Sequence, residues 1–328
     1  MSRCNKIESI KFSSFELKYL LSKLSIATGI NFDYYRDKFV EKRIKSRMIR
    51  LKITNATSYL NYILKNPDEI DKFKSIFTIN ISYFFRNREL FEMLARIIYE
   101  SLKASNKIFQ REKINNKIAL LDSNLIENGR NDRIKLPEIV RQLSLFKKLQ
   151  TNLNLNIWSC ACASGEEPYS LAIMLNEFKE NILNFPSYRI IASDIDNNSL
   201  ENAYKGIYSE EVMNEVPKIY RLKYFKTFKG QFGQKYSVCD KIKKQVTFFH
   251  EDVTKPHKKS YIYDIILCRY FLIYTEKDAR DQILETLEEH LAKGGLLVLG
   301  KTETLFDSSK NLKLIDNRNH IYLKTTDN

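Results

Sequence analysis

Residues Asn156–Leu175 read NIWSCACASGEEPYSLAIML, and this stretch decides the fold class of the chain. A short apolar run, Ile157–Ala161, is followed by small residues and then by a helical pattern from Pro168. That order predicts a strand, a tight loop and a helix. Gly165 permits backbone angles that other residues avoid, so a ligand could approach the loop closely. In an α/β sheet, the crevice beyond the carboxyl end of such a strand binds nucleotides.

Strand and helix patterns alternate after this stretch, which predicts a parallel sheet covered by helices. We expect strands at Leu155–Ala161, Arg189–Ala192, Val246–His250, Tyr263–Leu267 and Leu296–Leu299, with a turn at Gly294–Gly295 and a final antiparallel pair at Leu312–Ile315 and His320–Leu323. Ser164 and Glu167 have the spacing of a capping box for the first helix. Tyr224–Phe228 and Lys235–Val238 predict a small antiparallel hairpin.

The N-terminal part has helical periodicity instead. Helices are expected at Phe15–Ala27 (capped by Ser14 and stopped by Gly29), Tyr35–Leu51, Ala56–Leu64, Asp71–Phe77 and Glu89–Leu102. The predicted domains are therefore a helical substrate-binding domain at 1–90, a linker helix with a basic insertion at 91–154, and a sheet domain at 155–328. The β-subdomain is expected at about 218–240.

Composition and charge narrow the class of protein. The chain has 328 residues, of which 43% are hydrophobic, enough for two domains with a large core. No apolar run approaches the roughly 18 residues of a membrane span, and the first residues lack the apolar core of a signal peptide. The five scattered cysteines do not suggest a disulfide framework, so we expect a reduced, cytoplasmic protein without direct membrane insertion.

The positive charge is concentrated in the helical part. The net charge is +14, and residues 1–90 alone hold 18 Lys and Arg against 9 Asp and Glu. This excess suggests an anionic partner. Four arginines follow one flank of the apolar stripe of the predicted helix Tyr35–Leu51, and we expect them to bind substrate: Arg36, Arg43, Arg47 and Arg50. A solvated basic helix is the alternative interpretation.

Polar residues follow successive predicted strands on one side of the sheet. Glu166 follows the first strand, Asp194 the second, Asp252 the third and Arg269 the fourth. An ionised carboxylate after the second strand can accept both ribose hydroxyls, and one near the first loop can pair with an ammonium. No G-x-G-x-x-G pattern is present. The set therefore suits S-adenosylmethionine better than a dinucleotide.

Five segments along the chain form a motif series: NISYFFRN, WSCACASGEEPYSLAIML, ASDIDNNSLENAYKGIYS, YDIILCRYFLIYTEKD and GKTETL. In this order they resemble the motifs of the chemotaxis receptor protein-glutamate O-methyltransferases. The resemblance covers the chain from about residue 10 to its end, except 103–154, where the family has a shorter linker. It implies a Rossmann-like, class I S-adenosylmethionine methyltransferase sheet with an N-terminal all-helical domain and a small antiparallel β-subdomain.

The resemblance also implies the site residues. Arg86 and Tyr274 are expected near the transferred methyl, as catalytic residues. Cofactor contacts are expected from Asn80, Ser82, Arg86, Glu166, Asp194, Asp252, Val253, Arg269 and Tyr270. Two residues depart from the family pattern: Ser82 replaces a threonine, and Tyr270 replaces an asparagine beside the cofactor site. The second change puts turnover in question.

The implied activity is methylation of glutamate side chains on the cytoplasmic helices of chemotaxis receptors, which would leave S-adenosylhomocysteine as product. We expect a monomer whose basic helix faces the receptor and no nucleic-acid partner, because no Asn/Asp-Pro-Pro-aromatic motif follows the fourth strand. In some members the β-subdomain binds a receptor C-terminal peptide as an added strand; the sequence leaves this open here. The alternative is a catalytically impaired paralogue that binds the cofactor or the receptor.

Overall fold

The computed structural model describes residues 10–77, 82–105, 118–121, 136–151, 153–231, 233–255, 261–305 and 309–325. The chain divides into two compact units. The first contains residues 1–80 and 272–282, and the second contains 81–271 and 283–328. In the parts that the structure describes, no helix is long and apolar enough to cross a membrane.

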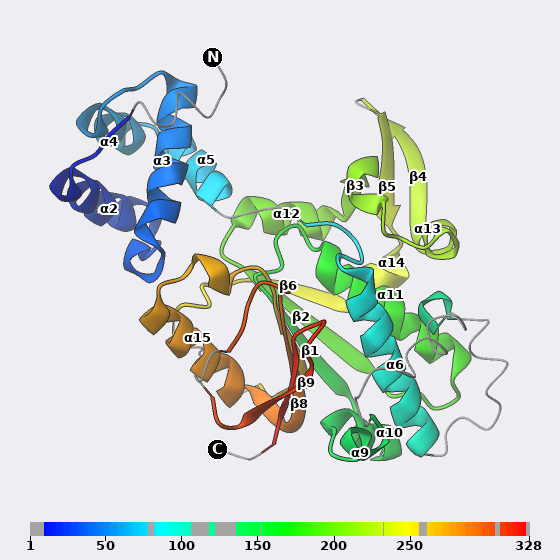
Figure 1. Cartoon of the computed structure of the whole chain (residues 1–328). Helices are drawn as coiled ribbons and strands as arrows, with labels where there is room; N and C mark the ends of the chain where they lie inside the picture. The colour runs from blue at the N-terminus through cyan, green and yellow to red at the C-terminus, as the bar shows by residue number, and fades with distance from the viewer. Residues whose placement is uncertain are drawn as a thin grey trace. The chain divides into compact units, whose positions relative to one another are not determined.

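The first unit is helical (Figure 1). Its helices are α2 (Ser14–Thr28), α3 (Asp37–Leu51), α4 (Ala56–Lys65), α5 (Pro67–Phe77) and the start of α15 (Lys277–Glu289), with short 3-10 helices at Phe32–Tyr34 and Leu272–Tyr274. The apolar stripe expected for the basic helix is confirmed, because Val40, Ile44 and Met48 are fully buried. An aromatic cluster closes this core, with the Phe77 ring 5.1 Å from Phe32 and 4.8 Å from Tyr35.

The second unit is built on a seven-stranded sheet in the order β6-β2-β1-β7-β8-β10-β9. Its strands are β1 (Leu155–Cys160), β2 (Tyr188–Asp194), β6 (Val246–His250), β7 (Tyr263–Cys268), β8 (Leu291–Leu299), β9 (Leu312–Asp316) and β10 (Ile321–Lys324). The first five are parallel, and β10 is antiparallel to both of its neighbours. The prediction of a parallel sheet ending in an antiparallel pair is confirmed.

Helices pack on this sheet or on one another and complete its core. They are α6 (Arg88–Ala104), α9 (Leu136–Val140), α10 (Ser144–Thr151), α11 (Glu166–Asn181), α12 (Asn197–Lys205) and α14 (Asp240–Lys243), with a 3-10 helix at Ala119–Leu121. Figure 1 shows α6 beside α11, and α10 packs on β8. The described parts of 103–154 thus contribute buried side chains, among them Val140 and Leu149, to the core of the second unit.

The small β-subdomain has three strands rather than two. They are β3 (Ile207–Ser209), β4 (Phe225–Gly230) and β5 (Gly233–Val238), in the order β3-β5-β4, beside a 3-10 helix at Glu210–Met213 and α13 (Lys218–Tyr224). The hairpin was predicted, but β3 was missed because three residues are too few to show alternation. Tyr208 of β3 lies opposite Tyr236 of β5, and both are buried.

Three local predictions were wrong. The cap of α2 is Ser13, which forms a capping box with Glu16, rather than Ser14. The expected capping box at Ser164 is absent, because Gly165 occupies the cap in a left-handed conformation and makes no side-chain bond there. Gly294–Gly295 is not a turn before the strand, since β8 already begins at Leu291 and passes through both glycines with a shift of register.

Candidate active site

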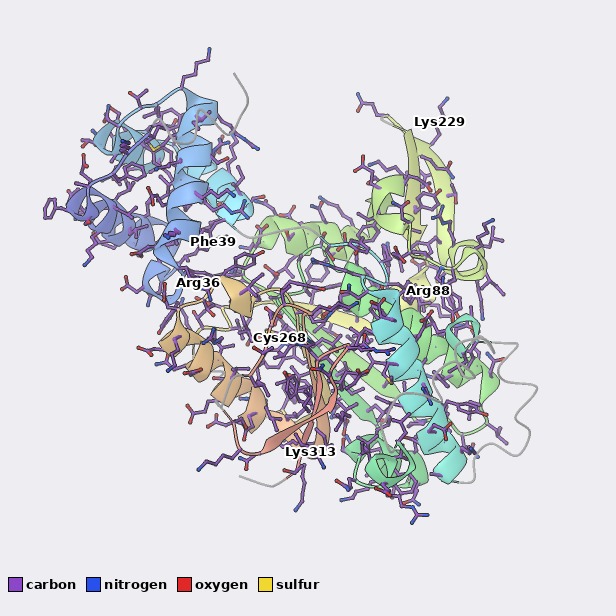
Figure 2. All side chains as sticks on the ribbon, viewed as in Figure 1. Arg36, Phe39, Arg88, Lys229, Cys268 and Lys313 are labelled. Atoms are coloured by element: carbon purple, nitrogen blue, oxygen red, sulfur yellow. The ribbon has the colours of Figure 1, made fainter. Side chains whose placement is uncertain are left out.

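The carboxyl ends of four strands meet at one edge of the sheet. Cys160 at the end of β1 lies opposite Ser193 of β2 and Cys268 of β7, and Asp194 lies opposite His250 of β6. Figure 2 shows Cys268 within the fold, where it is fully buried. Residues with positive φ gather in the segments that follow these ends and in the loop before α6: Phe85, Asn87, Ala161, Ala163, Gly165 and Tyr270. Such strained backbone is typical of functional sites.

Asp194 anchors the loop that follows β1. Its carboxylate accepts hydrogen bonds from the backbone N–H groups of Ala163, at 2.8 Å, and Asp196, at 2.9 Å. Burial raises the pKa of Asp194 from 3.8 to about 6, and the two N–H donors oppose this shift. Each carboxylate oxygen has a second lone pair, so Asp194 can still accept from ribose hydroxyls.

Glu166, the first residue of α11, is a buried acid at the same edge. Its carboxylate accepts from the Ser164 hydroxyl at 2.9 Å, and among the described residues no Lys, Arg or His forms an ion pair with it. Burial raises its pKa, while hydrogen bonds from its own backbone, Ser164 and Ser82 act in the opposite direction. An uncompensated buried carboxylate favours a cationic ligand group such as the ammonium of an amino-acid tail.

Gly165 makes the approach to this loop possible. Its φ is +89°, and a Cβ atom would lie 2.8 Å from the Cβ of Ala203 and 3.2 Å from the ring of Phe248. Any side chain there would be strained and would displace α12 or β6. The glycine expected from the sequence is therefore required by both backbone conformation and space.

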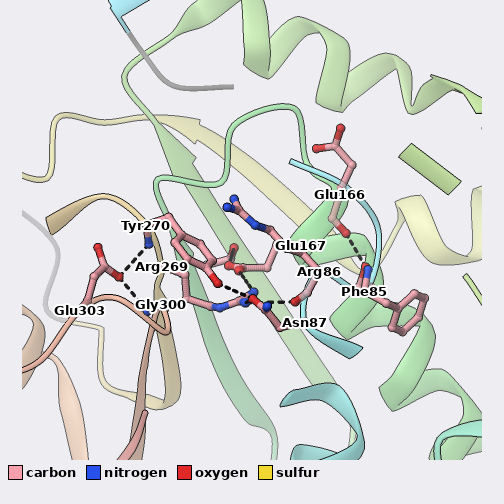
Figure 3. Close-up of polar contacts among 11 residues, drawn as sticks. Phe85, Arg86, Asn87, Glu166, Glu167, Arg269, Tyr270, Gly300 and Glu303 are labelled. Carbon is pink, nitrogen blue, oxygen red and sulfur yellow. Dashed lines mark hydrogen bonds and ion pairs between the residues drawn. The ribbon is translucent and has the colours of Figure 1, made fainter. Parts of the chain in front are cut away.

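Arg269 links the end of β7 to the loop that carries Arg86 (Figure 3). One guanidinium nitrogen donates to Glu167 at 2.9 Å, and another donates to the carbonyl of Arg86 at 3.0 Å and to the side-chain oxygen of Asn87 at 2.5 Å. Glu167 also accepts from the Ser159 hydroxyl at 2.8 Å. Arg269 is only 7% exposed, so in this structure it fixes the backbone at Arg86.

The loop before α6 is held from its other side as well. The Phe85 N–H donates to the Ser170 hydroxyl at 2.9 Å, and the Phe84 N–H donates to the carbonyl of Val212 at 3.0 Å. The Phe84 ring packs edge-on against Tyr208 and Phe225. The two phenylalanines of the FFR motif are therefore core residues that present the following arginine at the sheet edge.

The other predicted cofactor residues differ in the contacts that they make in the structure. Ser82 bonds Glu166, Asp252 accepts from the N–H and hydroxyl of Thr254, and Val253 is half-buried in the adjoining turn. Tyr270 stacks on Arg86. Asn80 lies outside the described residues. The cofactor roles of these residues stay predictions.

Tyr274 belongs to the helical unit, whereas Arg86 belongs to the sheet unit. Its ring stacks on Phe39 at 4.7 Å, and its carbonyl accepts from the Arg36 N–H at 3.0 Å. Phe39 also lies under the Arg43 guanidinium, 5.2 Å away. The joint action of Arg86 and Tyr274 stays a prediction.

The row of four arginines is not uniform, and this corrects the expectation for Arg47. Arg47 is 8% exposed and forms two hydrogen bonds with Glu69 of α5, at 2.5 and 2.6 Å, so it is committed to the helical core. Arg36 precedes α3 (Figure 2) and donates to the Thr275 carbonyl. Arg43 is half-buried and Arg50 is exposed. Helical spacing placed the row on one flank, but it could not reveal an acid on another helix.

Sequence reasoning also missed Asn87 and Glu303. Asn87 accepts from Arg269 and Tyr270, and Glu303 accepts from the backbone of Tyr270. Both lie in quoted motifs, NISYFFRN and GKTETL, which were the available signal.

Comparison with known proteins decides the family. Residues 131–321 match "CheR methyltransferase, SAM binding domain", and residues 16–78 match "CheR methyltransferase, all-alpha domain". The chain belongs to the CheR methyltransferase family. The resemblance, the fold class and the S-adenosylmethionine cofactor predicted from the sequence are thereby confirmed.

Curated relatives agree with this assignment. The chain is 29% identical to a chemotaxis protein methyltransferase of Borreliella burgdorferi, over 94% of each chain. It is 26% identical to one of Listeria monocytogenes, over 90% of this chain and 92% of that protein. The sheet unit of this CheR-family chain therefore contains most of the S-adenosylmethionine-binding domain. That Glu166 binds the ammonium and Asp194 the ribose stays a prediction, which their buried carboxylates support.

We expect cofactor binding to depend on pH through Asp194. Because its pKa is raised to about 6, the folded chain keeps a proton between pH 3.8 and 6 that the unfolded chain has released. The contribution of Asp194 to stability is therefore lost as pH rises through 6. Ionised Asp194 is the better hydroxyl acceptor, so the Kd for S-adenosylhomocysteine should rise by up to about tenfold per pH unit below 6. Calorimetry between pH 5 and 8 would measure this; an unchanged pH dependence in Asp194→Asn would contradict it.

Glu166→Gln should weaken cofactor binding while stabilising the ligand-free chain. The change keeps the shape and removes a buried charge, so the affinity for S-adenosylhomocysteine should fall roughly tenfold, within the range for a hydrogen bond to a charged group. Thermal unfolding without ligand should move upward, because the raised pKa reports an unfavourable buried charge. Glu201→Gln is the matched control, since the Glu201 side chain is 67% exposed. Equal effects of the two changes would argue against the assigned role.

Proposed function

We propose that this CheR-family methyltransferase esterifies glutamate side chains on the cytoplasmic helices of chemotaxis receptors. The observation that carries the proposal is the match to the CheR methyltransferase domain together with Arg86 at the sheet edge, on the loop that Arg269 fixes. Relatives named chemotaxis protein methyltransferases support the substrate class. Loss of negative charge from the receptor helices would raise signalling output.

The chemistry demands little acid–base help from the chain. The substrate carboxylate is already ionised near neutral pH and needs no general base. When bound, S-adenosylmethionine supplies an electrophilic methyl group. The chain must then hold the carboxylate in line with that group and exclude water. We assign the first task to Arg86, whose guanidinium can form a charge-assisted, bidentate contact with a carboxylate.

Residues of the helical unit are assigned to substrate contact. Tyr274 would position the second carboxylate oxygen. Arg36, Arg43 and Arg50 would attract the acidic receptor helices, while Arg47 supports the helix that carries two of them. We further propose that the protein acts in the cytoplasm as a monomer, that S-adenosylhomocysteine leaves as the product, and that nucleic acid is not a substrate.

A catalytically impaired binding paralogue is the alternative that Tyr270 raised. The family assignment and the curated relatives favour an active methyltransferase. The Tyr270 ring in this structure is stacked on Arg86, and its hydroxyl bonds Asn87.

The decisive experiment is transfer of radiolabelled methyl from S-adenosylmethionine to a cytoplasmic chemoreceptor fragment. We expect base-labile label, released as methanol, on receptor glutamates. The control is the same fragment with those glutamates replaced by alanine. No base-labile label despite calorimetrically proven cofactor binding would refute the proposal.

A further inference from the structure

Tyr270 is held in an unusual backbone conformation by a buried acid. Its φ is +61°, in the left-handed region that non-glycine residues rarely occupy. One carboxylate oxygen of Glu303 accepts the N–H groups of both Tyr270 and Gly300, each at 2.7 Å, and Glu303 is 3% exposed. A Cβ atom on Gly300 would lie 2.7 Å from that carboxylate and 2.9 Å from the Tyr270 nitrogen, so the contact requires glycine.

This backbone places the Tyr270 side chain against the loop that carries Arg86. The guanidinium carbon of Arg86 lies 3.7 Å from the centre of the Tyr270 ring, and that of Arg269 lies 5.3 Å away (Figure 3). The Tyr270 hydroxyl donates to the side-chain oxygen of Asn87 at 2.5 Å, the same oxygen that accepts from Arg269. The Tyr270 side chain thus contacts two cations, Arg86 and Arg269, and also Asn87, the residue that precedes α6.

These contacts have a consequence for Arg86. Its main chain is fixed through its carbonyl by Arg269, but an arginine side chain has many rotamers. An aromatic face at 3.7 Å restricts those rotamers and attracts the guanidinium electrostatically. It also offers negative quadrupole density near two like charges, which reduces the cost of bringing them together. An asparagine at position 270 has no π-face and provides none of these effects.

We propose that Tyr270 is a positioning residue that presets the Arg86 guanidinium for the substrate carboxylate through the stacking of its ring, with the hydroxyl bond to Asn87 as a smaller contribution. At this position an aromatic ring that stacks on Arg86 thus stands in place of the asparagine of the family pattern. This inference rests on the proposed function, since it assigns Arg86 to the carboxylate. It answers the question about turnover that the replacement of the family asparagine raised, and it implies that Tyr270→Asn lowers turnover.

The kinetic test compares three substitutions of Tyr270 on the receptor fragment. Tyr270→Leu and Tyr270→Asn remove the ring face and should lower kcat roughly tenfold. Tyr270→Phe keeps the face and loses only the hydroxyl bond, so it should retain most of kcat. In an Arg86→Ala background, Tyr270→Leu should cause no further loss, because the group it positions is gone. Tyr261→Leu is the matched control, at a tyrosine that is 47% exposed.

Three kinetic outcomes would overturn the inference. They are a Tyr270→Asn variant as active as the parent, a Tyr270→Phe variant as impaired as Tyr270→Leu, and a full tenfold loss on adding Tyr270→Leu to Arg86→Ala. The last would indicate a merely structural role, which acts whether or not Arg86 is present.

A spectroscopic test needs no substrate. In the full chain labelled with 15N-arginine, the Arg86 Nε–Hε signal, assigned by Arg86→Lys, should be shifted upfield by the ring above which it lies. Tyr270→Leu should move the signal downfield, leaving only the weaker effect of the Tyr83 ring 5.8 Å away, and Tyr270→Phe should not. An unmoved signal in Tyr270→Leu would overturn the inference. If the parent chain fails to methylate the receptor but shows this shift, the proposed function fails and the positioning contact stands.

Discussion

Arg86→Ala should lower kcat for receptor methylation by about 100-fold, a larger change than in the affinity for S-adenosylhomocysteine. The reason is that Arg86 is assigned to orient the reacting carboxylate, and misplacement of a reacting group costs this order of rate. The kcat of Arg86→Lys should lie between that of the parent chain and that of Arg86→Ala, because lysine keeps the charge and loses the planar fork. Steady-state methylation and calorimetry on the same preparations would separate the effects on turnover and on binding.

The neighbouring Arg88 offers a matched control. Its side chain is 41% exposed and pairs with Glu92 one helical turn away on α6. Such a pair contributes only about 0.3–0.5 kcal/mol, so Arg88→Ala should leave both kcat and binding nearly unchanged. An Arg86→Ala variant with the kcat of Arg88→Ala would remove Arg86 from the reaction.

Glu69→Ala should destabilise the helical unit by about 3–5 kcal/mol, because it leaves the buried guanidinium of Arg47 unpaired. Glu69 is 2% exposed and Arg47 8%, so water cannot easily replace the lost partner. The double replacement Arg47→Met with Glu69→Leu removes both charges and should cost far less than the single change. Urea denaturation followed by circular dichroism would measure the free energies of unfolding.

The control and a second measurement keep this prediction testable. Glu41→Ala breaks the pair of Glu41 with Lys45, whose side chains are 29% and 13% exposed, and should cost less than about 1 kcal/mol. If Glu69→Ala is too unstable to purify, Glu69→Gln can replace it. Amide hydrogen exchange in α3 and α5 should then be faster in Glu69→Gln than in Glu41→Ala. A loss for Glu69→Ala no larger than for Glu41→Ala would contradict the structural role of the buried pair.

Much of the fold could be read from short-range patterns. The strand Val246–His250 was predicted to the residue, and the other sheet strands were located within a few positions, except that β8 begins five residues early. Alternation, helical spacing and Gly29 as a helix stop are local signals, because each depends only on residues within or next to one element. The errors occurred where a local signal competes with tertiary packing, as at Gly294–Gly295 and in the three-residue β3.

The strand-end acids of the site could also be predicted, since parallel strands carry their carboxyl ends to one edge. Their position directly after a predicted strand therefore sufficed to place Glu166 and Asp194 at this edge. The same holds for Gly165, between the first strand and its helix. The pairing of Arg47 with Glu69, the bonds from Arg269 to Asn87 and Glu167, and the support of Tyr270 by Glu303 did not. These contacts join residues from 22 to 182 positions apart, and no periodicity connects them.

The sequence by itself thus determined the family, the polar residues that follow each strand and the cofactor. These depend on residue types at fixed points along local elements. Only the tertiary structure decided which arginines are committed to the core and which residues Tyr270 contacts. A side chain's role depends on its burial and on its partners in space. At Tyr270 the deciding partners are Arg86 and Asn87, on the loop before α6, and Glu303, in the segment after β8.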